Sequence, residues 1–159
     1  MAKALVAYYT RSGNTQKMAA EIAAGLKAEA VEVELKQIEK VSVEELVDYD
    51  ILAFGSPTYY GSAAYQVKKL LDESVKLHGK LDGKIGAAFA SAANIAGGNE
   101  TTVQHILNAF LIHGMVIQGD PRGDHYGPVS IGDPDQRSLD ECKRLGKRIA
   151  ALAKKMFNV

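Results

Sequence analysis

Three hydroxyl side chains, an amide and a cation lie close together near the N-terminus of this chain. They occupy the junction between a continuous apolar run and a helix-period segment, so they join the end of a strand to the start of a helix. Backbone N–H groups at a helix N-terminus, together with hydroxyl donors, bind anions such as phosphate, whereas a simple helix cap needs one such residue. We therefore predict a phosphate-binding loop formed by Thr10, Arg11, Ser12, Gly13, Asn14 and Thr15.

Other phosphate-binding folds leave different sequence motifs, and this chain has none of them. It has no Gly-x4-Gly-Lys-Ser/Thr stretch, which excludes a Walker-type nucleotide site, and no Gly-x-Gly-x-x-Gly stretch, which excludes a dinucleotide fingerprint. A receiver domain needs an aspartate where the first or third strand ends, but those ends are Tyr9-Thr10 and Gly55-Ser56. The predicted phosphate site therefore belongs to another class.

Two adjacent aromatic residues, Tyr59 and Tyr60, follow a second buried strand. Neighbouring side chains of an extended chain cannot both point into a core, and aromatic faces stack on flat conjugated rings. A turn covered by one tyrosine is the alternative interpretation. The segment that we predict to bind a flat ring comprises Ser56, Pro57, Thr58, Tyr59, Tyr60 and Gly61.

A third segment, rich in small residues, follows the next strand. Small side chains let the backbone approach a ligand closely and present its N–H and C=O groups to ring heteroatoms. A Gly-Gly pair before a helix is common, so this segment is informative mainly through its position beside the other two. It comprises Ser91, Ala92, Ala93, Asn94, Ile95, Ala96, Gly97 and Gly98.

Strand-like apolar runs alternate with helix-period segments along all 159 residues, which predicts one α/β domain spanning 1–159. Right-handed crossovers then give a parallel sheet with helices on both faces, and ligands bind beyond the C-terminal strand ends. The three segments above should meet there. Strands are expected at 3–9, 31–36, 50–55, 84–90 and 115–118, and helices at 14–28, 43–47, 62–77, 99–113 and 138–157.

Composition excludes several classes of protein. Lys plus Arg and Asp plus Glu each number 19, so no net charge attracts nucleic acid or an anionic membrane. One cysteine, Cys142, excludes an internal disulfide framework and a multi-cysteine metal site, and the histidines show no metal motif. The first apolar run, 4–9, is too short for a secretory signal, and no run approaches a membrane span. These features predict a cytoplasmic protein without metal.

The sequence resembles the flavodoxin-like superfamily, and within it most closely the WrbA-like NAD(P)H:quinone oxidoreductases. Their known fold is a three-layer sandwich around a five-stranded parallel sheet of order 2-1-3-4-5, and the resemblance implies FMN as cofactor. Flavodoxins, which are electron carriers, come second, because the Gly-Asn-Thr of the phosphate loop is like theirs. The matching stretches are 8–10, 54–58, 97–102, 113–117, 126–128 and 145–150.

The resemblance also implies roles for particular residues. The loop from Thr10 to Thr15 would hold the FMN phosphate, Thr58 to Tyr60 the isoalloxazine ring, and Ser91 to Ala96 its polar edge. His113 matches a family histidine next to the flavin and is the predicted catalytic residue. From the sequence alone, His113 equally ends a helix, where a positive charge favours the helix dipole.

Two main functions from different classes remain open. One is a reductase that passes hydride from NAD(P)H through FMN to a quinone or similar small acceptor; the other is an electron carrier between redox proteins. A non-catalytic flavin-binding regulator is a third. Carriers usually hold the flavin between two aromatic side chains, but this chain has no Trp, and the third segment has no aromatic residue. One flavin face is then open for a substrate, which favours the reductase.

Charge distribution along the chain predicts self-association. Residues 29–50 contain eight acids and two bases, whereas the last helix, from Ser138, contains six bases and two acids. Opposite charges at two ends of one chain favour association of its copies into a symmetric homo-oligomer, a dimer or a tetramer. They fit this role better than that of a surface that steers a carrier towards its partners.

Overall fold

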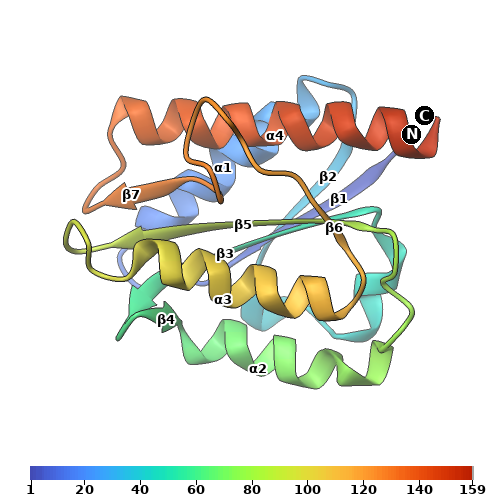
Figure 1. Ribbon diagram of the computed structural model, residues 1–159, viewed down its shortest axis with the longest axis horizontal. Coiled ribbons are helices and arrows are strands. Elements are labelled where there is room, and N and C mark those ends of the chain that lie inside the picture. The colour runs from blue at the N-terminus through green and yellow to red at the C-terminus, as the bar shows by residue number, and fades with distance from the viewer. Residues whose placement is uncertain (159) are drawn as a thin grey trace.

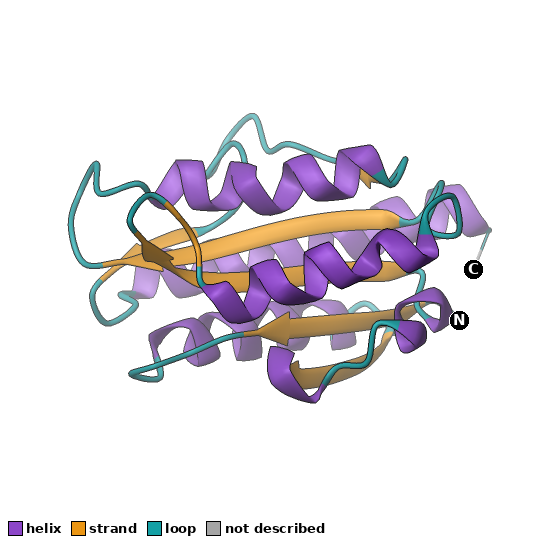
Figure 2. Ribbon diagram, turned by 90° about the horizontal axis from the view of Figure 1, so that it is seen from below, coloured by secondary structure: helices purple, strands orange, loops and turns teal. Residues whose placement is uncertain are grey.

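A parallel sheet with helices on both faces organises the computed structural model, which describes residues 1–158 (Figure 1). The strand order is β2-β1-β3-β5-β6, which confirms the predicted three-layer α/β fold and its order 2-1-3-4-5. Figure 2 shows helices in front of and behind the strands. The strands are β1 (Lys3–Tyr8), β2 (Glu32–Gln37), β3 (Ile51–Tyr59), β4 (Ser62–Ala63), β5 (Ile85–Ala92), β6 (Val116–Ile117) and β7 (Val129–Ile131).

Four α-helices cover the sheet in two pairs. Helices α1 and α4 lie on one face, and α2 and α3 lie on the other (Figure 1). None of the helices within 1–158 combines the length and apolar character that a membrane crossing requires. The helices are α1 (Asn14–Lys27), α2 (Tyr65–Glu73), α3 (Asn99–Ile112) and α4 (Gln136–Phe157), with short 3-10 turns at Ile38–Lys40, Glu44–Asp48 and Ser74–Leu77.

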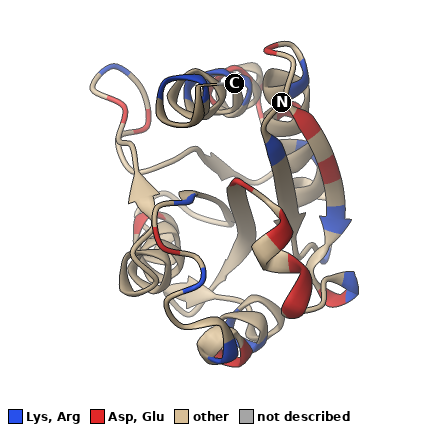
Figure 3. Cartoon of the chain, turned by 90° about the vertical axis from the view of Figure 1, so that its right-hand side faces the viewer, with Lys and Arg blue, Asp and Glu red and all other residues tan. Residues whose placement is uncertain are grey.

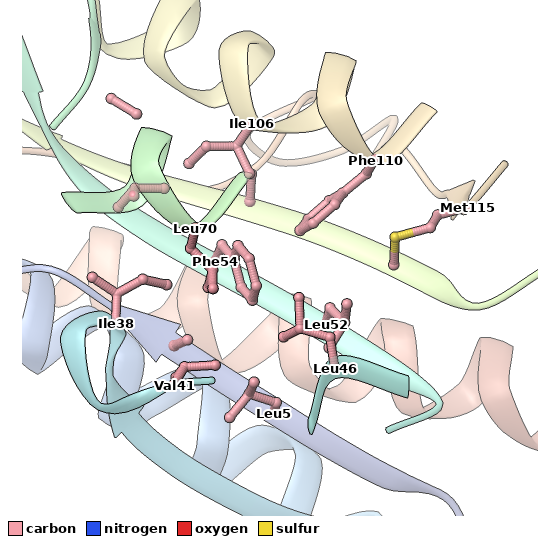
Figure 4. Packing of buried hydrophobic residues seen from close by; sticks show 14 of the residues in the cluster. Leu5, Ile38, Val41, Leu46, Leu52, Phe54, Leu70, Ile106, Phe110 and Met115 are labelled. Atoms are coloured by element: carbon pink, nitrogen blue, oxygen red, sulfur yellow. The ribbon is translucent and has the colours of Figure 1, made fainter. Parts of the chain in front are cut away.

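Strand β3 contributes to the cores on both faces of the sheet. Its side chains alternate, so Leu52 and Phe54 pack beneath α2 and α3, whereas Ile51 and Ala53 pack beneath α1 and α4. The rings of Phe54 and Phe110 meet edge to face, with centroids 5.1 Å apart (Figure 4). All five of these side chains are fully or almost fully buried, so their packing fixes the position of β3 relative to the helices.

The last strand of the sheet differs from the sequence prediction. It is predicted at 115–118, but it consists of two pieces that pair with opposite ends of β5: β6 beside Ile85, and β7 beside Ala90 to Ala92. The intervening segment runs out beside α4, where Asp120 accepts hydrogen bonds from Arg144. The ion pair between loop and helix holds this excursion in place. With the short β4, the strands therefore number seven among the described residues.

Strand register brings the three predicted segments to one edge of the sheet. Tyr8 at the end of β1 lies beside Gly55 of β3, and Pro57 of β3 lies beside Ser91 of β5. Because β1, β3 and β5 are parallel, the chain leaves all three strands at the same edge, at the left of Figure 1. This edge carries the candidate site.

Candidate functional site

A cleft of about 240 Å³ lies at this edge of the sheet. All three predicted segments contribute to it, together with one residue after β7. Its lining consists of Thr10, Arg11, Ser12, Asn14, Thr15, Pro57, Thr58, Tyr59, Ser91, Ala92, Ala93 and Gly132.

The start of α1 is built to leave its backbone donors available. Gly13 precedes the helix with φ 95°, in the left-handed region, and no side chain caps the helix. The Thr10 hydroxyl instead accepts a 2.9 Å hydrogen bond from the N–H of Gly13, which shapes the loop before the helix begins. No acid lies in the first turn of α1. The structure therefore does not support the alternative that these polar residues serve only to cap the helix.

Two of the three segments are joined by a buried contact. The hydroxyls of Thr15 and Ser91 lie 2.9 Å apart, and both side chains are buried. Ser12 and Arg11, by contrast, are exposed at the mouth of the cleft. Thr15 thus fixes the loop after β1 against β5, while Ser12 and Arg11 are free to meet a ligand.

The segment with two tyrosines is not a free loop. Strand β3 continues to Tyr59 and pairs antiparallel with β4, so that Thr58 opposes Ala63. Tyr59 lines the cleft and meets Tyr9 edge to face, with centroids 6.4 Å apart. Burial raises the pKa of the Tyr59 phenol. Tyr60 lies at the turn, with φ 49° and a fully exposed side chain.

Side chains from β3 and α3 hold the turn after Tyr60 at three points. Thr101 donates to the carbonyl of Gly61 at 2.6 Å, and the Nδ1 atom of His105 accepts from the N–H of Ala63 at 3.1 Å. The Ser56 hydroxyl accepts from the N–H of Ala64 at 2.8 Å. Buried Ser56 is therefore a structural residue of the turn and does not line the cleft. Thr101 and His105 were not predicted, although their spacing of four residues places them on one helix face.

The segment after β5 lines the cleft only in its first part. Ser91, Ala92 and Ala93 form the wall, whereas the stretch 94–97 is exposed and is not part of the lining. Gly132, after β7, completes the wall and was missed, because three strand residues between Pro128 and Gly132 are too few to show alternation.

The structure contradicts the predicted position of His113. Helix α3 starts near the cleft and has 14 residues, so its two ends lie about 21 Å apart, and His113 follows the far end. Its Nε2 atom lies 2.7 Å from the Ser74 hydroxyl, in a different cavity. Burial and nearby His78 lower the pKa of His113, which favours the neutral ring over a cation at the helix end. The family motif identified His113 in the sequence, but it did not predict where its side chain lies in this fold.

The cleft is positively charged. Arg11 is the one ionised side chain in its lining, and no carboxylate of the described residues lines it. Thr58 Oγ1 is buried in the wall without any hydrogen-bond partner in the described chain. Buried hydroxyls are normally hydrogen-bonded, so this atom is a candidate partner for a polar group of a ligand.

The model of the flavodoxin domain family matches residues 5–111 of this sequence. The chain belongs to the flavodoxin family. This confirms the resemblance inferred from the sequence and, with it, FMN as the cofactor. The Cβ of a larger residue at Gly98 would lie 2.6 Å from Gly61 Cα, so this flavodoxin-family protein needs glycine where the turn approaches α3.

Individual relatives of this flavodoxin-family protein have two kinds of name. A flavodoxin from Aquifex aeolicus is 39% identical over 94% of this chain and 86% of its own length. An NAD(P)H dehydrogenase (quinone) from Archaeoglobus fulgidus is 34% identical over 98% of this chain and all of its own. Among solved structures, a flavodoxin from the domain Archaea matches with a TM-score of 0.80 and 33% identity, over 96% of this chain and 99% of its own. A redox role is common to these names.

Proposed function

We propose that this protein is an FMN-dependent oxidoreductase that uses NAD(P)H to reduce a quinone or a similar small acceptor. The observation that carries the proposal is the charge of the cleft: Arg11 lines it, and no carboxylate among residues 1–158 does. A cation stabilises negative charge on a reduced ring and so favours transfer of two electrons together. The relatives named NAD(P)H dehydrogenase (quinone), at 34% identity, support the same assignment.

The donors of the cleft fit the groups of FMN. The uncapped N-terminus of α1, with the hydroxyls of Thr10 and Ser12, suits the phosphate dianion. The unpartnered Thr58 hydroxyl and the backbone of Ala92 and Ala93 suit the polar groups of the ring. When bound, FMN supplies the ring that accepts hydride and returns electrons to an acceptor. The protein itself orients that ring and neutralises its charge.

Access to the cleft favours an enzyme over a carrier. The exposed segment 94–97 has no aromatic residue to cover a flat ring from the side of β5. Ile95, which is 84% exposed, instead gives an apolar rim on which a nicotinamide or a quinone can rest. Two substrates that use the same open face in turn would follow ping-pong kinetics.

An electron carrier is the second candidate. The fully exposed Tyr60 favours it, since an aromatic side chain at the rim of the cleft can cover the flavin and leave only its edge to a partner protein. The Aquifex aeolicus relative named flavodoxin supports this alternative.

Steady-state oxidation of NADH and NADPH with a panel of quinones decides between the two. If the protein is a reductase, its FMN-loaded form oxidises the nucleotide when a quinone is present. This activity is lost when FMN is removed. Absence of turnover with every quinone, combined with rapid reduction by a flavodoxin reductase, would establish the carrier instead.

We also propose that the protein is a homo-oligomer. Figure 3 shows acidic residues on β2 and the nearby 3-10 turns, and basic residues on α4. Part of the basic charge is already paired within the chain, since Lys154 contacts Glu29 and Arg144 contacts Asp120. Light scattering at several protein concentrations and two salt concentrations tests the proposal, and a monomer under all conditions would contradict it.

A further inference from the structure

A second cavity lies between α2 and α3, away from the cleft. It measures about 360 Å³, against about 240 Å³ for the cleft, and the two share no lining residue. Its volume lies within the range of small-molecule sites. Its lining consists of Lys68, Leu71, Asp72, Ser74, Val75, His78, His105, Asn108, Ala109, Ile112 and His113.

The exposed surface of this α2–α3 cavity is mainly apolar, although seven of its lining residues carry polar groups. On α3, His105, Ala109 and Ile112 follow the helix period and therefore lie on one face. Val75 and Ile112 are 71% and 73% exposed, so the folded chain leaves this apolar surface uncovered. Small Ala109 leaves room between the helices that a larger side chain would fill.

The hydrogen bonds of the two buried or half-buried histidines fix their ring protons. His105 accepts from the N–H of Ala63 at Nδ1, so its neutral ring carries hydrogen at Nε2 and offers a donor. Ser74 donates to the carbonyl of Leu71, so His113 donates from Nε2 to the Ser74 hydroxyl. His78 lies beside His113, with ring centroids 6.4 Å apart. Within the described chain, no cluster of three or more His, Cys, Asp or Glu side chains is placed to hold a metal ion.

His105 connects this cavity to the FMN cleft. It lines the cavity, and its Nδ1 holds Ala63 of β4. Ala63 pairs with Thr58 of β3, which lines the cleft and has the unpartnered hydroxyl. One hydrogen bond and one strand pair therefore separate an occupant of the cavity from a wall of the cleft.

We propose that the α2–α3 cavity binds a planar aromatic compound of one or two rings that carries a carbonyl or carboxylate oxygen, and that its occupancy changes FMN binding through His105. The imidazole rings and apolar helix faces suit an aromatic body. The Nε2–H of His105 suits the oxygen, while the ammonium of Lys68 pairs with Asp72 and so balances the carboxylate in the cavity lining. The coupling, but not the binding, depends on FMN lying in the cleft.

Calorimetry with 2-naphthoate and the FMN-loaded protein tests the binding. Ala109→Phe fills the space between the helices and should weaken naphthoate binding at least tenfold. Leu111→Phe adds the same ring on α3 outside the cavity and should leave binding unchanged. FMN should stay bound while naphthoate is added to the FMN-loaded protein, which separates the cavity from the cleft as the place where naphthoate binds.

FMN titrations with and without saturating naphthoate test the coupling. We expect the dissociation constant of FMN to change at least threefold in the parent, and FMN to change naphthoate affinity by the same factor. His105→Gln keeps a donor and an acceptor and should retain the effect. His105→Leu should abolish it, even when naphthoate is raised to saturate that variant.

Four outcomes would overturn the proposal. No binding of naphthoate, or equal binding by the parent and Ala109→Phe, removes the site. Equal FMN affinity with and without naphthoate removes the coupling. If Ile112→Asp converts an oligomer into monomers and naphthoate does not bind, the cavity is an interface between copies of this chain.

Discussion

The hydroxyl of Thr101 donates a 2.6 Å hydrogen bond to the carbonyl of Gly61, across 40 residues of sequence. It joins the first turn of α3 to the turn between β3 and β4. The contact is possible because Gly98 lets the two backbones approach closely. The position of the two tyrosines beside the cleft therefore depends on a helix that contributes no side chain to the cleft itself.

Replacing Thr101 by Val removes this donor while keeping the shape of the side chain. We expect the dissociation constant of FMN to rise about two- to tenfold, since a neutral hydrogen bond contributes about 0.5–1.5 kcal/mol. Titration of the apoprotein, followed by quenching of flavin fluorescence, measures the change. Thr101→Ser keeps the hydroxyl and is the matched control; equal losses in both variants would refute the role of the hydrogen bond.

Replacing Ser12 by Ala should weaken FMN far more than riboflavin. Ser12 is exposed and lines the cleft, whereas Thr15 is already engaged by Ser91, so Ser12 reports on the ligand alone. A charge-assisted hydrogen bond is worth about 1.5–3 kcal/mol, which corresponds to roughly ten- to a hundredfold in affinity. Riboflavin lacks the phosphate and serves as the control ligand. Equal losses for the two flavins would argue against phosphate binding by this loop.

The two tyrosines should respond differently to truncation. Tyr60→Ala removes a fully exposed side chain, so the free energy of unfolding of the apoprotein should not change while FMN affinity falls about two- to tenfold. Tyr59→Ala also removes the contact with Tyr9 and should lower that free energy as well. Urea unfolding and FMN titration measure both quantities. If neither variant loses FMN affinity, the segment does not contact the ring.

Anaerobic titration with NADH or NADPH should bleach the flavin in one two-electron step. Opposite charges about 6 Å apart attract by roughly 2–3 kcal/mol at an effective dielectric of 20, so a cleft with Arg11 and no carboxylate favours the fully reduced anion. Arg11→Gln should lower the midpoint potential of the flavin. A long-lived blue one-electron form with dithionite, and no bleaching by either nucleotide, would identify a carrier.

Stability should depend on acid through Glu34. Hydrogen bonds from Lys36 and Lys3 lower the pKa of its carboxyl from 4.5 to about 2. A lowered pKa in the folded state gives stability that is present above pH 4.5 and is lost as the pH falls towards 2. Glu34→Gln should therefore destabilise the protein at pH 7 and have little effect near pH 2. Urea unfolding at both pH values measures this, and an effect that grows in acid would contradict it.

The sequence by itself determined the alternation of strands and helices and the edge at which the site lies, whereas the sheet order followed from the resemblance to the flavodoxin-like superfamily. Apolar runs and helix periods depend on neighbouring residues, so they can be recognised without the fold. The prediction of a phosphate loop could also be made from the sequence, because Thr10 to Thr15 lie together in the chain and a helix N-terminus is a site for anions. The lining of the cleft includes residues from all three predicted segments.

Only the tertiary structure decided how the turn beside the cleft is held and where His113 lies. Thr101, His105 and Gly132 act on segments distant in sequence, and no local pattern marks such contacts. The place of His113 follows from the length and direction of α3, which carry it to the end opposite the cleft. The chemistry of a single loop can be predicted from residues that are neighbours in the sequence. Contacts across the fold depend on how the whole chain packs, so no short stretch of sequence predicts them.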